Sequence, residues 1–240
     1  MNKKIFKHAR TFHKALGYVL ALQIFFWLLG GLVMSVIPLE KVHGKHIAQR
    51  TIGNPFTSED YSLALDPIRA TTDGITDIHY DFFLDTPLYR IKTKDETLYL
   101  NAITGAPQNK PSIDQIIAQA KLHYLGDAQP ASIVSLDQGP REARNAKNLW
   151  HVSYDDSINT SLYFSQQSGK LLTVRSDLWR IFDFFWMLHI MDYQEREDFN
   201  HPLLIIFAFS SVLFCLSGIT LILQRPLNKR RAQRKAQQNA

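Results

Sequence analysis

Two long apolar stretches lie near the ends of the chain, and shorter stretches of alternating polar and apolar residues lie between them. Residues 15–37 have Gln23 as their only strongly polar side chain, and residues 203–223 carry no formal charge. A helix rises about 1.5 Å per residue, so each stretch can cross about 30 Å of hydrocarbon. The first stretch is too long for the apolar region of a signal peptide, and no small-x-small cleavage site follows it before Pro38. The pattern predicts transmembrane helices over residues 15–37 and 202–223.

Charge is distributed unevenly along the chain and predicts its orientation. The 240 residues have a formal net charge of +5, but residues 1–39 and 201–240 carry only basic charges, whereas residues 40–200 are acidic on balance. Basic flanks of membrane spans remain in the cytoplasm. We therefore expect cytoplasmic tails over residues 1–14 and 224–240, and a large external loop, which we take to be periplasmic, on a bacterial inner membrane. The basic balance gives no indication of a nucleic-acid partner.

The composition and the absence of common motifs exclude several kinds of chemistry. The one cysteine, Cys215, lies in the second apolar stretch, which excludes an intrachain disulfide and a CxxC motif. The sequence has no GxGxxG and no P-loop, and its tails are too short to bind a dinucleotide, so NADH is not expected as a direct electron donor. It also lacks HExxH and GxSxG, so proteolysis is not expected.

The external loop contains an internal repeat. LYLNAITG at 98–105 returns as LYFSQQSG at 162–169, and LYRI at 88–91 corresponds to LWHV at 149–152 with a longer turn in the second copy. Apolar residues alternate in both copies, which predicts two β-hairpins, with Gly105 and Gly169 in turns. The pattern also predicts a helix near 112–125, opened by a capping box at Ser112 and Gln115, and a matching helix over 58–68 in the first copy that Pro67 shortens.

These repeated segments, LYLNAITGAP and LYFSQQSGKL, resemble the strand-turn element of PepSY domains. Their position between two apolar helices resembles the PepSY-associated transmembrane family, as do HKALG at 13–17, which is similar to its HRxxG opening, and WMLH at 186–189, which is similar to its Leu-His element. The family usually continues with a glycine-rich link, whereas this chain continues with an acidic segment over 192–198. The resemblance covers nearly the whole chain.

The resemblance implies a membrane α+β fold, in which two transmembrane helices flank a duplicated PepSY-like helix-plus-antiparallel-sheet periplasmic domain. That domain would occupy residues 38–177, followed by an interfacial aromatic helix and acidic linker over 178–201. Members of the family include ferric and ferric-siderophore reductases that hold haem b between transmembrane helices, and small two-span proteins associated with ferrous iron supply. The resemblance therefore implies haem b as cofactor, ferric iron or a ferric chelate as substrate, and a ferrous iron transporter as a possible partner.

Holding haem between membrane helices requires neutral imidazoles at one membrane depth, on facing helices, with apolar walls around the porphyrin. The candidate ligands are His13 at the cytoplasmic end of the first span, His43 and His201 at the external boundary, and His189 behind an aromatic face. His13 has no histidine in the second span to pair with, so a haem there would need a second subunit. In one continuous helix His189 and His201 would be about 18 Å apart, too far to share an iron. The aromatic face also suits an interfacial belt, which leaves the role of His189 open.

Two further features admit more than one interpretation. Small residues at 208, 211, 215 and 218 form a stripe on the second span, which suits packing on the first span, a homodimer contact, or room for a macrocycle. The carboxylates of Asp192, Glu195, Glu197 and Asp198 are hard oxygen donors suited to a ferric ion, although an acidic loop can also be simply solvated.

The sequence therefore predicts a haem b ferric reductase that reduces iron at the periplasmic face for ferrous iron uptake. Its electron donor would be a quinol, a flavoprotein or another carrier. The alternative is a non-enzymatic, membrane-anchored module that contacts a periplasmic partner.

Overall fold

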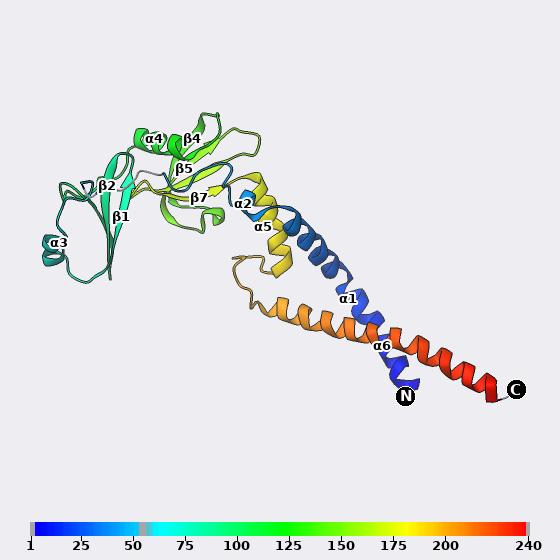
Figure 1. Ribbon diagram of the computed structural model, residues 1–240. Helices are drawn as coiled ribbons and strands as arrows, with labels where there is room; N and C mark the ends of the chain where they lie inside the picture. The colour runs from blue at the N-terminus through cyan, green and yellow to red at the C-terminus, as the bar shows by residue number, and fades with distance from the viewer. Residues whose placement is uncertain (1–2, 53–56, 58, 239–240) are drawn as a thin grey trace. The chain divides into compact units, whose positions relative to one another are not determined.

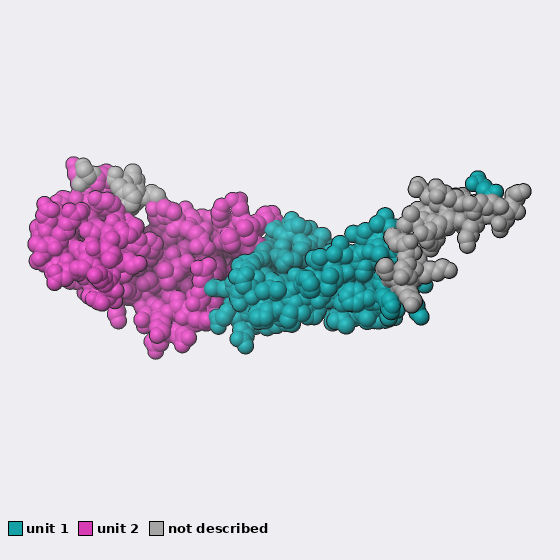
Figure 2. All heavy atoms as spheres, turned by 90° about the horizontal axis from the view of Figure 1, so that it is seen from below, with its two compact units in different colours: residues 1–37, 182–240 teal, residues 38–181 magenta. Residues whose placement is uncertain are grey.

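The computed structural model describes residues 3–52, 57 and 59–238, and its fold is α+β. The chain divides into two compact units, which Figure 2 shows in two colours: residues 1–37 with 182–240, and residues 38–181. We call them the helical unit and the α/β unit. The described helices are α1 (Lys3–Val36), α2 (Leu39–Val42), α3 (Leu65–Thr71), α4 (Ile113–His123), α5 (Asp177–Ile190) and α6 (Pro202–Gln238), with a short 3-10 helix η1 (Arg141–Ala143).

The helical unit contains α1, α6 and the last part of α5 (Figure 1). Two of its segments, Phe6–Val36 and Pro202–Leu223, are long and apolar enough to cross a membrane by length and composition. Both helices extend beyond the predicted spans, because α1 begins at Lys3 rather than near Ala15, and α6 continues through the basic segment to Gln238.

The first half of the α/β unit is a three-stranded antiparallel sheet in the order β1-β2-β3, made of β1 (Ile75–Phe83), β2 (Thr86–Thr93) and β3 (Thr97–Asn101). It follows α3, whose Ile68 packs with Tyr89, Ile91 and Ala102 in a small core. The predicted hairpin is confirmed, since Leu88 pairs with Asn101 and Ile91 with Leu98.

The helix predicted over residues 58–68 is wrong in its bounds. Ser58 lies outside the described residues, and α3 begins at Leu65. Pro67 therefore falls in the first turn of α3, where the missing N–H removes no helical hydrogen bond.

The second half of the α/β unit is a four-stranded antiparallel sheet in the order β4-β5-β6-β7, made of β4 (Pro130–Gln138), β5 (Lys147–Tyr154), β6 (Ser161–Ser165) and β7 (Leu171–Arg175). The capping box is confirmed, because Ser112 and Gln115 cap α4 reciprocally. Ile116 and Ala120 of α4 pack into the main core with Val152, Leu162 and Phe164.

The predicted turn glycines are confirmed, since Gly105 and Gly169 have φ of 75° and 69°. Both halves have the order helix followed by antiparallel strands, in line with the internal repeat. Their origin by duplication and their relation to PepSY stay predictions.

Candidate functional site in the helical unit

His13 joins α1 to α6 in a close polar contact. Its Nδ1 lies 2.8 Å from Ser217 Oγ and 3.2 Å from the carbonyl oxygen of Phe214, and its ring stacks on the Phe214 ring at 4.2 Å. Because a carbonyl only accepts, we assign the proton to Nδ1, which leaves the lone pair on Nε2. Gly218 permits this approach, since an added Cβ would lie 3.1 Å from the His13 ring. Of the small-residue stripe, Gly218 therefore packs against α1 within one chain, whereas Cys215 is exposed.

The last turns of α5 contact the second half of α1 at Gln23 and Gly30. Gln23 Nε2 donates a hydrogen bond of 3.1 Å to the carbonyl oxygen of Leu188. An added Cβ at Gly30 would lie 3.3 Å from the carbonyl oxygen of Phe185 and 3.8 Å from His189 Nδ1. The only strongly polar side chain of the first apolar stretch therefore satisfies a carbonyl in the last turn of α5, which has no partner within its own helix.

His189 lies beside Trp27, with ring centroids 6.3 Å apart. The Nδ1 atoms of His189 and His201 and the Nε1 atom of Trp27 are buried, and none of the three has a hydrogen-bond partner among the described residues. Such groups are uncommon in folded proteins and call for a ligand, an ion or a water. α5 ends at Ile190, so the separation expected for His189 and His201 in one continuous helix does not apply.

The acidic segment after α5 is organised around Asp192, which is only 5 % exposed. Its two carboxylate oxygens accept hydrogen bonds from the backbone N–H groups of residues 194, 195, 197 and 198. Burial raises the pKa of this carboxyl, but these donors outweigh it and the net pKa is lowered. Arg196 pairs with Asp183, and Trp186 Nε1 donates to the Arg196 carbonyl oxygen. The loop is thus held by its own polar groups.

The predicted ferric ligands are not brought together as one metal site. Asp192 is committed to backbone N–H groups, whereas Glu195, Glu197 and Asp198 are exposed. Among the described residues, no three His, Cys, Asp or Glu side chains are grouped so as to hold a metal ion.

Two of the four predicted haem ligands, His13 and His189, do not meet within one chain. His43 belongs to the α/β unit, where it is exposed at the end of α2; partial burial and the nearby charges of Arg50, Arg175 and Lys45 lower its pKa. His13 and Gly30, the residue of α1 that lies against His189, are 17 positions apart, or about 25 Å along α1. His13 and His189 therefore cannot bind the same iron.

Haem b is the group that the resemblance implies, and His189 and His13 each fit an axial ligand in one respect. His189 has a buried, unpartnered ring nitrogen beside the aromatic side chain of Trp27. His13 has its Nδ1 hydrogen-bonded to a carbonyl, the arrangement that orients metal-binding imidazoles. Each would need its opposite ligand from another histidine or another chain.

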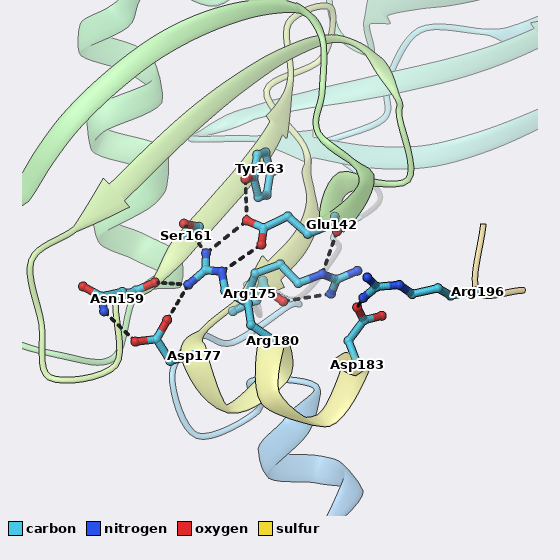
Figure 3. Close-up of polar contacts among 10 residues, drawn as sticks. Glu142, Asn159, Ser161, Tyr163, Arg175, Asp177, Arg180, Asp183 and Arg196 are labelled. Carbon is cyan, nitrogen blue, oxygen red and sulfur yellow. Dashed lines mark hydrogen bonds and ion pairs between the residues drawn. The ribbon is translucent and has the colours of Figure 1, made fainter. Parts of the chain in front are cut away.

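A second polar cluster lies in the α/β unit, around Arg180 in α5 (Figure 3). Its guanidinium donates to Glu142, Asp177, Ser161 and the carbonyl oxygen of Asn159. Burial raises the pKa of Glu142, but the hydrogen bonds from Arg180 and Tyr163 lower it on balance. These bonds engage every donor of the guanidinium, so Arg180 has none left to bind an anion.

Sequence reasoning selected His13 and His189 but missed the residues that position them. Ser217 and Gly30 carried no signal that distinguishes them from other small residues in a span. Gln23 did carry a signal, as the one strongly polar side chain in an apolar stretch, because such a residue requires a partner.

Comparison with protein-family models, with curated proteins and with solved structures finds no match to this chain.

Proposed function

We propose that this chain is a two-span inner-membrane protein that holds haem b in its helical unit and reduces ferric iron at the external face. The observation that carries this proposal is the buried, unpartnered Nδ1 of His189 beside Trp27. A histidine that served only in an interfacial belt would direct its ring nitrogens to water or lipid headgroups. In this proposal, the α/β unit is an external, duplicated PepSY-like domain.

Residues at different positions in this chain would have different roles in the reaction. His189 would bind the cofactor near the external surface, and the apolar side chains of α1 and α5 would exclude water from it. Haem b, when bound, would supply one-electron transfer. The exposed carboxylates of Glu195, Glu197 and Asp198 would raise the local concentration of ferric iron without retaining the ferrous product.

A homodimer is one way to supply the second histidine ligand. An iron with two imidazole ligands needs two histidines at one depth, and the approximate 25 Å between the levels of His13 and His189 prevents their pairing. Two copies would place His189 opposite its equivalent. Electrons would come from a membrane quinol or another carrier, and the ferrous product would pass to a transporter.

The experiment is an absorbance spectrum of the purified protein, expressed with haem supplied, before and after dithionite. We expect a Soret band that shifts on reduction and relaxes when a ferric salt is added. His189→Ala should abolish the band or change its position, whereas replacing the exposed His46 of the α/β unit should leave it unchanged. A colourless, folded protein would contradict the proposal.

A second candidate function is a membrane-anchored binding module that needs no haem. The self-contained loop after α5 favours it, because Asp192 and the Asp183–Arg196 pair engage groups of the same segment. In that case His13→Ala and His189→Ala would both leave function intact.

A further inference from the structure

The last turn of α5 contacts the side chain of Gln23, which lies far from either end of α1. Gln23 is 13 residues before Val36, or about 20 Å along the helix. Its side-chain amide donates a hydrogen bond to the Leu188 carbonyl oxygen. Gly30, which lies between Gln23 and the end of α1, has no side chain and so allows the α5 backbone to approach closely. Residues 182–190 therefore run beside the apolar second half of α1 in the direction opposite to it.

The N-terminal half of α1 has a different partner, which is α6. Gly17 and His13 contact Phe214 and Gly218 of α6. Ser217 is 15 residues after Pro202, so α6 begins about 22 Å beyond the His13 contact, whereas Gln23 lies only about 15 Å beyond it. For two helices that cross at a small angle, the end of α5 reaches at least as deep as the start of α6.

Several backbone groups around the end of α5 have protein partners, as hydrocarbon requires, although the Nδ1 atom of His189 has none among the described residues. A helix end in lipid cannot use water, so its carbonyls need protein donors. Gln23 supplies one for Leu188, and the Asp192 carboxylate accepts the N–H groups of the following turn. The exposed side chains on this segment include Phe184, Tyr193 and Phe199, which suit acyl chains and the interface.

We propose that residues 182–190 insert into the bilayer from its external side, beside α1, and that the exposed acids of the following loop return the chain to the headgroup layer. The partner of this surface is lipid. The inference rests on the membrane placement in the proposed function and does not depend on haem.

The test compares three cysteines of similar exposure in a Cys215→Ala background, reconstituted in liposomes and treated with an impermeant maleimide from the external side. Phe184 is 49 % exposed in the protein, Tyr80 of the α/β unit 58 % and Ile206 of α6 60 %. A thiol reacts as thiolate, which hydrocarbon suppresses, so Phe184→Cys and Ile206→Cys should label about tenfold or more slowly than Tyr80→Cys. Labelling after denaturation gives the total thiol.

Two other outcomes separate the possible failures. If Phe184→Cys labels as fast as Tyr80→Cys while Ile206→Cys is protected, the insertion of α5 is overturned and the membrane span stands. If Ile206→Cys also labels fast, the membrane placement fails, and with it both proposals.

A second comparison does not depend on replacing Phe184 alone. Gln49 Nε2 donates to the carbonyl oxygen of Leu122 in the α/β unit, as Gln23 Nε2 does to that of Leu188. Because water can replace only the exposed bond, Gln23→Leu should accelerate the labelling of Phe184→Cys severalfold, and Gln49→Leu should leave it unchanged. Equal rates in both variants would contradict the inference.

Discussion

His13 Nδ1 lies 2.8 Å from Ser217 Oγ, and this contact links α1 to α6 in the half of the helical unit away from α5. The Ser217 hydroxyl in turn lies 2.7 Å from the Phe214 carbonyl oxygen. The three groups form a short polar chain between two apolar helices, with the imidazole held by both its ring face and its nitrogen.

Ser217→Ala should therefore weaken the pairing of α1 and α6. Hydrogen bonds between membrane helices average about 0.6 kcal/mol and reach about 1.7 kcal/mol, and we expect a loss in this range. Thermal unfolding in detergent measures it. Cys215→Ala is the control, because Cys215 lies on the same helix and is exposed. A loss as large in Cys215→Ala would show that His13 and Ser217 contribute nothing specific.

Gly30 and Gly31 provide a matched pair of substitutions on adjacent residues. A Cβ at Gly31 meets nothing within 4 Å, whereas a Cβ at Gly30 would lie 3.3 Å from the Phe185 carbonyl oxygen. Replacing a helical glycine by alanine gains up to about 1 kcal/mol. Gly31→Ala should thus raise the unfolding temperature, while Gly30→Ala should fail to raise it because α5 must move. The same rise in both variants would show that α5 does not pack closely at Gly30.

The strand and helix pattern of the α/β unit followed from short-range signals. The turn at Gly169 and the α4 capping box depend on residues a few positions apart, so the sequence was sufficient to predict them. The predicted start of α3 was wrong, because the polar segment ahead of Pro67 allowed more than one starting point for the helix.

The helical unit required information that the sequence does not contain. The meeting of Gln23 with Leu188 joins residues far apart in the chain, and it depends on which face of α1 receives α5. The sequence left the acidic segment open between ferric ligands and a solvated loop, and neither interpretation predicted that Asp192 turns inward to its own backbone. No periodicity distinguishes an exposed carboxylate from one that closes a loop.

Arg180→Met should destabilise the α/β unit by leaving Glu142 without its partner. Breaking a buried pair costs about 3–5 kcal/mol, and we expect roughly 2 kcal/mol because the Arg180 side chain is 34 % exposed. Chemical denaturation of the whole protein measures the change. The control is Arg69→Met, whose pairing with Asp66 is exposed at 4.0 Å and should cost less than about 1 kcal/mol. Equal losses would rule out a special role for the Arg180 cluster.

Stability should fall as the pH drops below about 6.5, because His123 is buried as the neutral imidazole. Burial lowers its pKa, although its hydrogen bond to the Gln49 carbonyl raises it in part. The unfolded chain therefore binds the proton more readily than the folded one, and acid favours unfolding. Burial also lowers the pKa of His151, so His123→Gln should flatten the slope below pH 6.5 only in part. Replacement of the exposed His46 should leave the slope unchanged.

Asp192→Asn distinguishes a loop-closing carboxylate from a ferric ligand. Asparagine keeps one acceptor oxygen in place of two and loses the charge, so part of the four backbone N–H bonds would be lost. Bonds to a charged group contribute about 1.5–3 kcal/mol each, so hydrogen exchange of the amides at 194–198 should accelerate at least about tenfold. Glu197→Gln, at an exposed side chain, should leave exchange unchanged. If Asp192→Asn weakened iron binding while amide exchange stayed slow, Asp192 would be a ferric ligand. A carboxylate that closes the loop would instead give faster exchange when it is replaced.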